Sequence, residues 1–394
     1  MTPLALDPYL RDWLDLGLRM LHVIAAIAWI GTSFYFVLLD QSLRPPKRSE
    51  DAEAGVGGEL WEVHGGGFYQ VQKYQVAPAT LPDHLAWFKW EAYTTWLSGF
   101  GLLVVLYYLD AHSTLIDPTV ADLTTAEAVA ISVGLLVVAW LAYDGLFRVL
   151  GQRELVFAAS LLVLTTLAAW GTEQLFAPRA AALEVGAMLG TIMAANVFFS
   201  IIPAHWDLIR AKEAGREPDP APALAAKQRS VHNNYLTLPV LLTMLAGHFA
   251  FVYTTGHAWL VLVALMLLGV WVRLFFNLRH AGRTHWWMPA VGAIAAVGLA
   301  VAVKPDNQSA APATGELSAG RKVFSSAGCA GCHTLADAGS TGTVGPNLDA
   351  AKPSADLVRQ RVENGLGPMP SFRGRLSQTE IDAVAAYVSS AAGK

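Results

Sequence analysis

Long apolar stretches limit what this chain can fold into. Of its 394 residues, 54% are apolar and 15% are charged, and the apolar residues come in long runs. A helix that crosses a bilayer needs about 20 mostly apolar residues, and a window of about 19 residues finds such spans. By that criterion the sequence predicts eight spans, at residues 16–39, 91–110, 126–150, 154–172, 182–203, 234–254, 258–280 and 286–303. We therefore expect an all-α fold based on a polytopic transmembrane bundle.

The composition changes after the last predicted span. Lys304 to Gly315 is rich in Pro, Ala, Asn, Gln and Ser, a composition that favours an extended, flexible tether. We expect a transmembrane domain over residues 1–303, a linker over 304–315 and a small helical domain over 316–394. The segment Met1–Asp15 carries three acidic residues and one arginine. Because a secretory signal begins with a basic region, we expect the first span to be retained.

Both cysteines of the chain lie in one motif, Cys329-Ala330-Gly331-Cys332-His333. Two thiols at this spacing, followed directly by a histidine, form the attachment pattern of c-type haem, because two thioethers and one axial imidazole come from a single turn. We expect a covalent haem c, attached at Cys329 and Cys332 and ligated by His333.

Two turns downstream contain further candidate residues for this haem. They are Gly345-Pro346-Asn347-Leu348 and Gly367-Pro368-Met369-Pro370, and no methionine other than Met369 follows Met288. A thioether ligand opposite the imidazole raises the reduction potential of the iron. We therefore expect Met369 to be the second axial ligand.

Helical segments flank these motifs. Ser377-Gln378-Thr379-Glu380 is a capping box before a final helix, and Glu316–Ala327 reads as a short amphipathic helix. The predicted buried side of that first helix consists of Leu317, Val323 and Phe324. Together these features resemble a class I cytochrome c, in which a proline carbonyl orients the proximal imidazole, and the resemblance implies this role for Pro346. A chance CxxCH motif, more often a metal or redox site in a cytosolic chain, would not explain the tether, the methionine loop and the last helix together.

The haem motif also predicts the orientation in the membrane. Thioether attachment takes place outside the cytoplasm in bacteria, so the C-terminal domain is expected in the periplasm, and an even number of spans places the N-terminus there too. The distribution of basic residues agrees, because Lys and Arg gather in cytoplasmic loops. The loops that this topology makes cytoplasmic contain Arg44, Lys47, Arg48, Lys73, Lys89, Arg148, Arg153, Arg210, Lys212, Arg216, Lys227, Arg229, Arg279 and Arg283. We expect a multi-pass protein of the bacterial inner membrane, and the sequence has no nucleic-acid-binding signature.

Two predicted spans carry histidines at matching depth. Ionisable groups inside spans are costly and usually pair or function. The polar and aromatic stripes of these two spans are His22, Trp29, Phe36 and Asp40 in the first, and Asn234, Thr237, Leu241, Met244 and His248 in the sixth. His22 and His248 both lie near the predicted periplasmic side, where two neutral imidazoles are able to ligate one haem b. The alternative is that each histidine hydrogen-bonds a backbone carbonyl or a neighbouring span.

The seventh span has a polar face near its predicted cytoplasmic end. Arg273, Asn277 and His280 follow one another at helical spacing, and Asp144 of the third span lies at a similar depth. One interpretation is a clamp for an anion or a haem propionate. The other is a buried Arg273–Asp144 pair, or a pair between Asp144 and its own neighbour Arg148.

The first predicted cytoplasmic loop, residues 41–90, is long for a connector. It contains His64-Gly65-Gly66-Gly67-Phe68-Tyr69 and ends at Trp87-Phe88-Lys89-Trp90, just before Glu91. Glycines let the backbone approach a ligand, and aromatic side chains suit a flat heterocycle. Alternatively, Trp87 and Trp90 lie at the level of the lipid headgroups.

Several motifs of the membrane domain resemble a known family. They are His22…Trp29-Ile30-Gly31, His64-Gly65-Gly66-Gly67-Phe68-Tyr69, Trp87-Phe88-Lys89-Trp90-Glu91, Ala195-Asn196-Val197-Phe198-Phe199 and Asn233-Asn234-Tyr235-Leu236. They are similar to the bacterial membrane-bound urate oxidases (urate hydroxylases) that end in a cytochrome c domain. The resemblance covers about residues 10–300 and the haem domain. It implies oxidation of urate to 5-hydroxyisourate with cytochrome c as electron acceptor.

We assign residues to this reaction from their positions and their chemistry, not from the resemblance. We expect Arg273 and Asn277 to hold the urate anion, and His64, Glu91 or His280 to accept protons. Electrons would pass through the membrane domain, by haem b, to haem c and on to a terminal oxidase or a soluble cytochrome c. The alternative function is a cytochrome subunit without its own chemistry that relays electrons from quinol or a partner dehydrogenase. A transporter fused to a redox sensor is a third alternative, which the missing inverted repeat disfavours.

Overall fold

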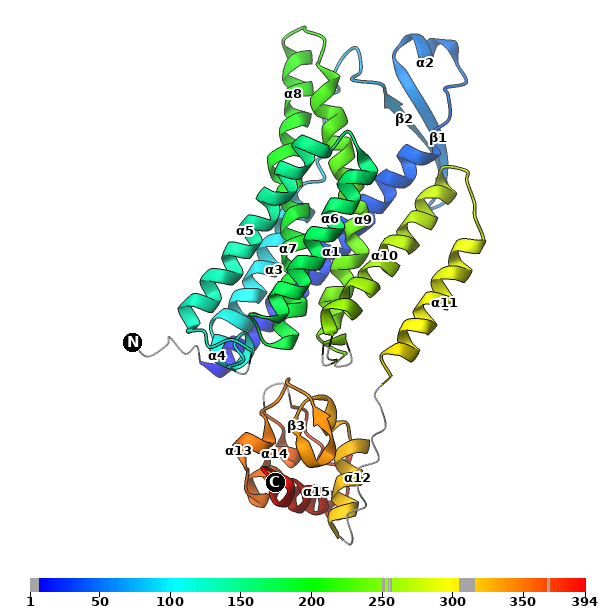
Figure 1. Ribbon diagram of the computed structural model, residues 1–394. Helices are drawn as coiled ribbons and strands as arrows, with labels where there is room; N and C mark the ends of the chain where they lie inside the picture. The colour runs from blue at the N-terminus through cyan, green and yellow to red at the C-terminus, as the bar shows by residue number, and fades with distance from the viewer. Residues whose placement is uncertain are drawn as a thin grey trace.

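The computed structural model describes residues 7–118, 120–249, 252–253, 255, 257–304, 316–366 and 369–394. Figure 1 shows a helical bundle with a β-hairpin at one end and a small helical domain beyond the opposite end. We call these the hairpin end and the cytochrome end of the bundle. Most of the predicted linker, residues 305–315, lies outside the described residues, as do Gly367 and Pro368 of the predicted methionine loop.

The bundle consists mainly of long helices. Its helices are α1 (Pro8–Ser42), α3 (Trp90–Leu103), α5 (Thr125–Leu150), α6 (Glu154–Glu173), α7 (Pro178–Asn196), α8 (Ile202–Glu213), α9 (Pro220–Ala246), α10 (Ala258–His280) and α11 (Trp287–Ala302), with short helices α2 (Ser49–Glu53) and α4 (Ala111–Thr114). Two π-helical segments, η1 (Val104–Tyr108) and η2 (Val197–Ile201), extend α3 and join α7 to α8. Such segments often occur at functional sites.

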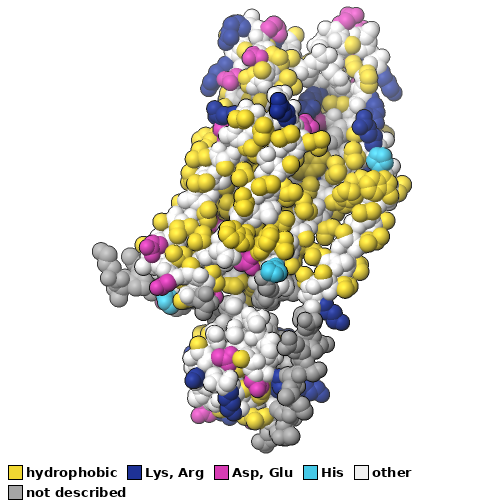
Figure 2. Space-filling model, in the orientation of Figure 1, with side chains coloured by type: hydrophobic (Ala, Val, Ile, Leu, Met, Phe, Trp, Pro, Cys, Tyr) yellow, Lys and Arg dark blue, Asp and Glu magenta, His cyan; other side chains and the backbone are white. Residues whose placement is uncertain are grey.

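Five helices are long and apolar enough to cross a membrane among the described residues: Tyr9–Ser42, Thr125–Leu150, Glu154–Glu173, Pro178–Glu213 and Ala258–His280. Every one of the eight predicted spans overlaps a helix, but three of these helices do not meet this criterion. Helix α3 has 14 residues before η1, α11 has 16, and α9 carries charged and amide side chains in its first half. Figure 2 shows hydrophobic side chains over the middle of the bundle on the visible face. The chain is therefore a multi-pass membrane protein with five clear spans, and the count of eight stays a prediction.

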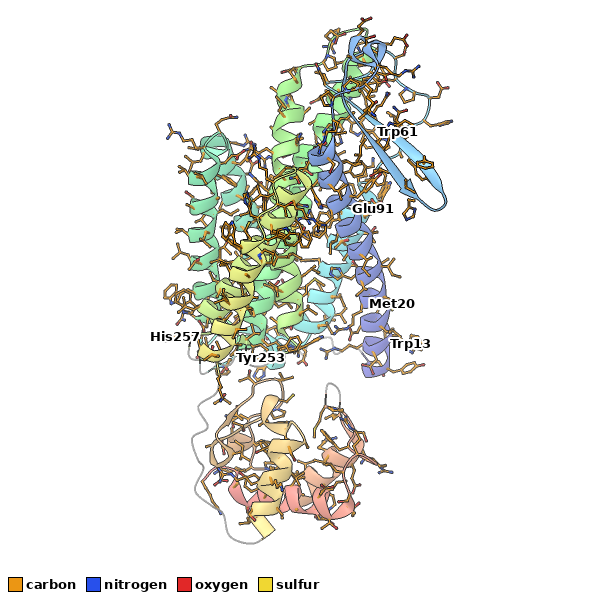
Figure 3. The ribbon with its side chains drawn as sticks, turned by 90° about the vertical axis from the view of Figure 1, so that its right-hand side faces the viewer. Trp13, Met20, Trp61, Glu91, Tyr253 and His257 are labelled. Carbon is orange, nitrogen blue, oxygen red and sulfur yellow. The ribbon has the colours of Figure 1, made fainter. Side chains whose placement is uncertain are left out.

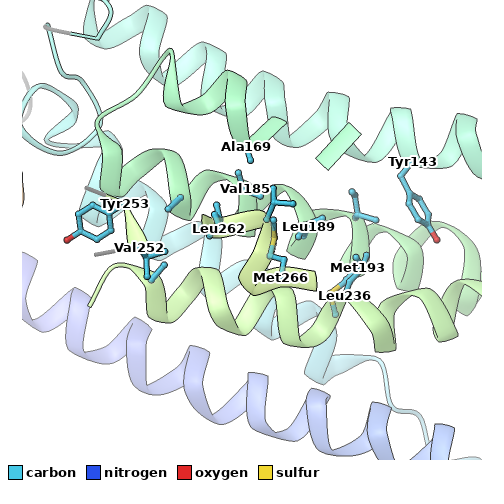
Figure 4. Packing of buried hydrophobic residues seen from close by; sticks show 14 of the residues in the cluster. Tyr143, Ala169, Val185, Leu189, Met193, Leu236, Val252, Tyr253, Leu262 and Met266 are labelled. Carbon is cyan, nitrogen blue, oxygen red and sulfur yellow. The ribbon is translucent and has the colours of Figure 1, made fainter. Parts of the chain in front are cut away.

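Helix α7 lies at the centre of the bundle. Of the most apolar window in Pro178–Glu213, 56% is buried by protein, against 17% for α5. Small residues permit this close packing, since a Cβ at Gly186 would collide with the hydroxyl of Thr243. Figure 4 shows the core that results, in which Val185, Leu189 and Met266 pack together between α7 and α10.

The all-α prediction is wrong for the loop between α1 and α3. Strands β1 (Val56–His64) and β2 (Gly67–Tyr74) form an antiparallel hairpin there. Gly65 and Gly66 have φ of 58° and 84°, the left-handed conformation that a tight two-residue hairpin turn requires. Only Trp61-Glu62-Val63-His64 alternates between large apolar and polar residues, which is a short period-two signal for a strand. The chain is thus mostly helical rather than all-α.

The C-terminal domain has its own core around two crossing helices. Its elements are α12 (Glu316–Ser326), η4 (Cys329–Gly331), β3 (Thr334–Leu335), η5 (Ala336–Ala338), β4 (Ser340–Thr341), α13 (Leu348–Ala351), α14 (Ala355–Asn364) and α15 (Gln378–Ala391). Val323 and Phe324 are buried as expected, but Leu317, in the first turn of α12, is 37% exposed. The predicted capping box at Ser377 and Glu380 is confirmed. Val344 packs against the core cluster of the bundle.

Candidate functional site

One face of α1 lines two separate cavities. The first lies at the hairpin end and has a volume of about 720 Å³, within the range of about 300–1,000 Å³ usual for ligand pockets. We call it the hairpin-side cavity. Its lining includes Trp29, Ser33, Phe36 and Asp40 of α1, Lys73 and Gln75 of the β2 side, Trp87 and Phe88, Val197 and Ile201 of η2, His205 of α8, and Lys227, Ser230 and Asn233 of α9. It was not predicted as a unit, because it assembles segments far apart in the sequence.

Aromatic rings form one wall of the hairpin-side cavity. Trp87 stacks on Trp206 with ring centroids 4.7 Å apart. Phe88 meets Phe36 edge to face at 5.1 Å, and the Lys89 ammonium lies 4.8 Å from the Trp87 ring centroid. Packed rings of this kind offer flat, rigid surfaces to a planar ligand.

Charged side chains also line the hairpin-side cavity. The Asp40 carboxylate pairs with Lys73 of β2, and its second oxygen lies 3.3 Å from Lys227 of α9. These side chains are a quarter to a half exposed, so the pairs contribute little to stability. With one carboxylate between two ammonium groups, the cluster has an excess positive charge that faces the cavity.

The second cavity, which we call the His22 cavity, is smaller, at about 230 Å³. It lies between α1, α3, α5, α7 and α9, and its lining includes Arg19, His22, Ala26, Trp29, Thr95, Trp96, Gly99, Phe100, Leu136, Gly186, Ala187, Gly190, Thr191, Met193, Thr237, Val240, Leu241 and Met244. The His22 Nδ1 atom is 3.0 Å from the carbonyl oxygen of Thr95 and 3.2 Å from the Ser98 hydroxyl. A Cβ at Gly99 would lie 2.9 Å from His22 Cε1, so the glycine makes room for the imidazole.

The structure does not bring His248 into the His22 cavity. Helix α9 ends at Ala246, and the exposed His248 follows in a turn. Among the described lining residues, α9 contributes Met244 at the corresponding end. The backbone bond expected as an alternative for His22 is present, and haem ligation by His22 and His248 stays a prediction.

Arg273 and Asn277 do lie together, around Asn234 of α9, which was not predicted to be their partner. Arg273 Nε and Asn277 Nδ2 both donate to Asn234 Oδ1, at 2.7 and 3.1 Å. The Arg273 guanidinium also lies 3.8 Å from the Phe34 ring centroid. Four buried atoms here have no hydrogen-bond partner in the described part of the chain: Arg273 Nη2, Asn234 Nδ2, Asn277 Oδ1 and His280 Nδ1.

The alternative Arg273–Asp144 pair is not the arrangement in the structure. Asp144 receives Arg148 Nε at 2.7 Å and Arg229 Nη2 at 2.5 Å, so the Asp144–Arg148 pair is confirmed and Arg229 is an additional partner. Arg229 also donates to Asn196. The physical reason is that Arg229 reaches Asp144 from α9. Arg273 belongs to α10, and its side chain contacts Asn234 of α9 and Phe34 of α1 instead.

The remaining predicted proton acceptors lie apart from one another. His64 is exposed at the turn end of the hairpin, in which Figure 3 labels Trp61. Glu91 lies in the first turn of α3, and its buried Oε2 has no partner among the described residues. His280 ends α10. The structure therefore does not bring His64, Glu91 and His280 into one site.

The residues expected around haem c lie close together in the C-terminal domain. His333 Nδ1 is 2.9 Å from the Pro346 carbonyl oxygen, which leaves Nε2 available as a ligand. A Cβ at Gly345 would collide with the His333 ring, so the chain leaves room for this imidazole. Burial raises the pKa of the Cys329 thiol to about 11. Met369 packs at the edge of the core, and these residues fit a covalent haem.

Sequence reasoning missed four residues of these sites. His205 follows Ile201 and precedes Leu208 at helical spacing, and Lys227 precedes Ser230 in the same way, so each had a weak periodic signal. Met244 was part of the predicted stripe but was not predicted to line a cavity. Asn234 was in the same stripe, and its pairing with α10 was not visible in the sequence.

Comparisons with known proteins agree with this division of the chain. Residues 8–304 match the family described as urate oxidase N-terminal, and residues 315–388 match the family described as cytochrome C oxidase, cbb3-type, subunit III. Cytochrome c6 of a Synechococcus species is 41% identical over 81 residues, covering 18% of this chain and 68% of that protein. Cytochrome c6 of Leptolyngbya boryana is 40% identical over 77 residues, covering 18% and 89%. The c-type cytochrome SorU from Sinorhizobium meliloti is 52% identical, covers 20% of this chain and 93% of its own, and has a TM-score of 0.19.

Proposed function

The chain belongs to the urate oxidase N-terminal family, here with a class I cytochrome c domain fused to its C-terminus, and on that premise we propose that it oxidises urate to 5-hydroxyisourate. In this reaction urate and one water yield 5-hydroxyisourate, two protons and two electrons. Haem c, when held by Cys329, Cys332, His333 and Met369, supplies a one-electron acceptor. Electrons then leave to a terminal oxidase or a soluble cytochrome c.

The hairpin-side cavity carries the proposal for the substrate site. Urate is flat and anionic near neutral pH, and this cavity combines aromatic walls with an excess of lysine charge. Its volume of about 720 Å³ admits a bicyclic purine with water. The ring would lie against Trp87 and Phe88, and its anionic edge would face Lys73 and Lys227.

A different observation favours the placement expected from the sequence, at Arg273 and Asn277. Among the described residues, Arg273 Nη2 and Asn234 Nδ2 are donors without an acceptor and Asn277 Oδ1 is an acceptor without a donor, a set that matches the edge of a purine anion. These atoms are closed off from solvent in this structure. Binding there therefore requires α1, α9 and α10 to separate, whereas the hairpin-side cavity is already open. We place urate in the hairpin-side cavity for this reason.

Proton removal is assigned to a histidine beside the substrate. A general base must come within hydrogen-bond reach of the proton it takes, and His205 lines the cavity. Glu91, His64 and His280, expected from the sequence, stay proposals for carrying protons onward, because the structure sets them apart from the cavity. Water then adds at C5 of the oxidised purine.

Electrons must cross most of the membrane domain to reach haem c. The hydrocarbon core of a bilayer is about 30 Å thick, and the hairpin end and the C-terminal domain lie at opposite ends of the bundle (Figure 1). Direct transfer over that distance is implausible, so we propose a relay in the membrane domain, most simply a haem b near His22. We also propose that the hairpin end faces the cytoplasm and the haem c domain the periplasm of a bacterial inner membrane.

Addition of urate to membranes that contain the full chain tests this function. We expect the absorption band of reduced haem c to appear without oxygen, and 5-hydroxyisourate to form at one molecule per two electrons. Allantoin, which lacks the conjugated purine ring, is the matched control ligand. Reduction of haem c by quinol or a partner dehydrogenase, with none by urate, would instead support the electron-relay subunit.

A further inference from the structure

We propose that the β1–β2 hairpin lies in the surface of the bilayer and inserts Trp61, Val63 and Phe68 at the boundary between the lipid headgroups and the acyl chains. The partner of this apolar patch is the leaflet at the hairpin end of the bundle. The inference goes beyond the proposed function, because it depends neither on the substrate nor on which side of the membrane is the cytoplasm.

The two faces of the hairpin point in different directions. Val63 is paired with Phe68 across the strands, and Trp61 precedes Val63 by two residues, so these three side chains share one face. We call it the outer face. Glu62 lies on the other face, where its carboxylate accepts a hydrogen bond of 2.6 Å from the Tyr35 hydroxyl of α1. The outer face therefore points away from α1.

The outer face changes from polar to apolar toward the turn of the hairpin. Its half far from the turn carries Glu59 and Gln72, which are paired across the strands. Its half near the turn carries Trp61, Val63 and Phe68, whose side chains are 57%, 71% and 78% exposed. An element that lies across the membrane surface needs such a division, with its apolar part buried about 5–10 Å below the headgroups.

The hairpin runs back along α1 toward the middle of the bundle. Backbone hydrogen bonds join Glu59 to Arg44, just beyond the end of α1, at 2.9 and 2.8 Å. Three residues further along β1, Glu62 already meets Tyr35, nine residues earlier in the chain than Arg44. The strand is therefore antiparallel to α1, and Figure 3 shows the hairpin, with Trp61 labelled, beside the bundle.

The turn of the hairpin lies level with the uncharged part of α1. No Asp, Glu, Lys or Arg occurs between Arg19 and Asp40, a stretch as long as one membrane crossing. Tyr35 and its partner Glu62 lie about 7.5 Å inside Asp40 along the helix axis, and Val63 follows at about 3.3 Å per strand residue. The headgroup zone beside the hydrocarbon core is about 5–8 Å deep. The apolar half of the outer face thus reaches the acyl chains.

Other aromatic side chains mark the membrane surface at this end of the bundle. Trp286 and Trp287, at the start of α11, are 70% and 57% exposed, and Trp90, at the start of α3, is 66% exposed. Tryptophan gathers at the level of the headgroups, and Figure 1 shows the turn between α10 and α11 at the same end as the hairpin. The outer face continues this lipid-facing surface.

Apolar contact rather than charge provides the attraction. Residues 43–75 contain four Lys or Arg and five Asp or Glu, so a negatively charged leaflet would not draw this segment in. Removal of the three large apolar side chains from water remains as the driving force. We therefore expect the hairpin to lie at the same depth in zwitterionic and in anionic bilayers.

A single nitroxide on the hairpin measures its depth in vesicles of phosphatidylcholine. Haem c takes up both native thiols of the matured full-length protein, so Phe68→Cys provides one free thiol for the label. Oxygen concentrates among acyl chains, whereas a nickel chelate stays in water, and both broaden the electron paramagnetic resonance of a nitroxide that they reach. We expect the label at residue 68 to meet oxygen more than nickel. Equal access of nickel to this label and to one at Glu50→Cys, in the exposed helix α2, overturns the proposal.

The same spectra distinguish the bilayer from a second copy of this chain. Two outer faces packed together would shield the labels from both reagents and would broaden their lines by contact between the two nitroxides. That result would replace the bilayer with a dimer as the partner and overturn the proposal. Narrow lines with access to oxygen support the bilayer.

A charge on the outer face should lift the hairpin out of the membrane. Trp61→Glu, combined with the label at residue 68, should reverse the ratio and give more access to nickel than to oxygen, because a carboxylate at the acyl boundary is costly. Ala54→Glu adds the same charge at an exposed position outside the outer face and should leave the ratio unchanged. Haem c content of each variant reports that the chain is folded and matured. An unchanged ratio in Trp61→Glu contradicts insertion.

Discussion

Single glycines determine where both candidate axial histidines sit. A side chain at Gly99 would meet the His22 ring and one at Gly345 would meet the His333 ring. In both places a carbonyl oxygen near Nδ1 fixes the ring, from Thr95 and Pro346 respectively. At the residue scale, therefore, each histidine is held by a small neighbour and one backbone acceptor.

Gly345→Ala should disturb the haem c site. The new methyl group would overlap the His333 ring, and overpacking of this kind typically costs about 1–3 kcal/mol. We expect a lower thermal unfolding temperature of the C-terminal domain, followed by the haem absorption, and a weakened bond between His333 and iron.

Ser389→Thr is the matched control for this substitution. It adds one methyl group to the same domain, at an exposed position of α15 outside the haem motif. Equal effects of the two variants would mean that the contact with His333 is not the cause.

Lys227→Gln should weaken urate binding. The substitution leaves Asp40 in the hairpin-side cavity with one lysine fewer, so an anion loses an attractive charge. We expect the KM for urate to rise about tenfold, equivalent to about 1.4 kcal/mol, with kcat little changed, since the charge acts on binding. Steady-state reduction of haem c by urate measures both constants.

Lys212→Gln is the control, because Lys212 pairs with Glu217 and does not line the cavity among the described residues. Arg273→Gln distinguishes the two placements of urate. A rise of KM in that variant, with none in Lys227→Gln, would move the substrate to the Arg273 side.

The sequence predicted individual residues where rarity and local spacing defined them. The two cysteines are the only ones in the chain, Met369 is the only methionine after Met288, and His22 is the only histidine in its apolar span. Asn234 was beyond prediction as the partner of Arg273 and Asn277, because that contact depends on how α9 packs against α10. Of the two partners of Asp144, Arg148 was predicted because it is a neighbour on the same helix. Arg229 was not predicted because it lies on a different helix.

At the scale of elements, helix ends decide which side chains face a site. Helix α9 begins at Pro220, well before the predicted span, and ends at Ala246, before His248. The predicted stripe therefore has the correct face, with Met244 as its last member in the His22 cavity. Helix positions followed from apolar runs, while the exact ends and the β-hairpin depended on packing against α1 and on the glycine turn.

Ser377→Ala should destabilise the C-terminal domain through the start of α15. The Ser377 hydroxyl caps the helix by accepting from the Glu380 backbone N–H, and loss of such a cap costs about 1 kcal/mol. A lower unfolding temperature of the domain is the expected result. Thr379→Ala, in the same turn and exposed, should change it much less, and equal effects would contradict the role of the cap.

The same capping box predicts a pH dependence. Hydrogen bonds from the Ser377 backbone and hydroxyl hold the pKa of Glu380 below its ordinary value. A lowered pKa in the folded state means that the ionised carboxylate stabilises the domain at neutral pH, and that this contribution is lost as the pH falls through the folded pKa. The wild type should therefore lose its advantage over Glu380→Gln in acid, as thermal unfolding from pH 7 down to about pH 3 would measure. An advantage that grows in acid would contradict the assignment.

At the scale of the whole molecule, α1 connects the proposed steps of the reaction. Its length of 35 residues brings one face past the His22 cavity, Trp29 and the hairpin-side cavity in that order. The C-terminal domain lies beyond the His22 end of the bundle, where Figure 3 labels Tyr253 and His257. The proposed substrate site and the haem c domain are thus at opposite ends, as an electron path across a membrane requires.

Epitope tags at the two ends test this topology in intact cells. One tag is placed between Gly65 and Gly66, in the exposed turn of the hairpin, and the other after Lys394. We expect antibody to reach the C-terminal tag in spheroplasts and the hairpin tag only after the inner membrane is permeabilised, because basic residues near the hairpin retain that end in the cytoplasm. A tag between α4 and α5, at the cytochrome end, serves as the control and should behave like the C-terminal tag. Access to both ends from the same side would remove the need for a relay, because the haem c domain could then dock beside the hairpin and take electrons there directly.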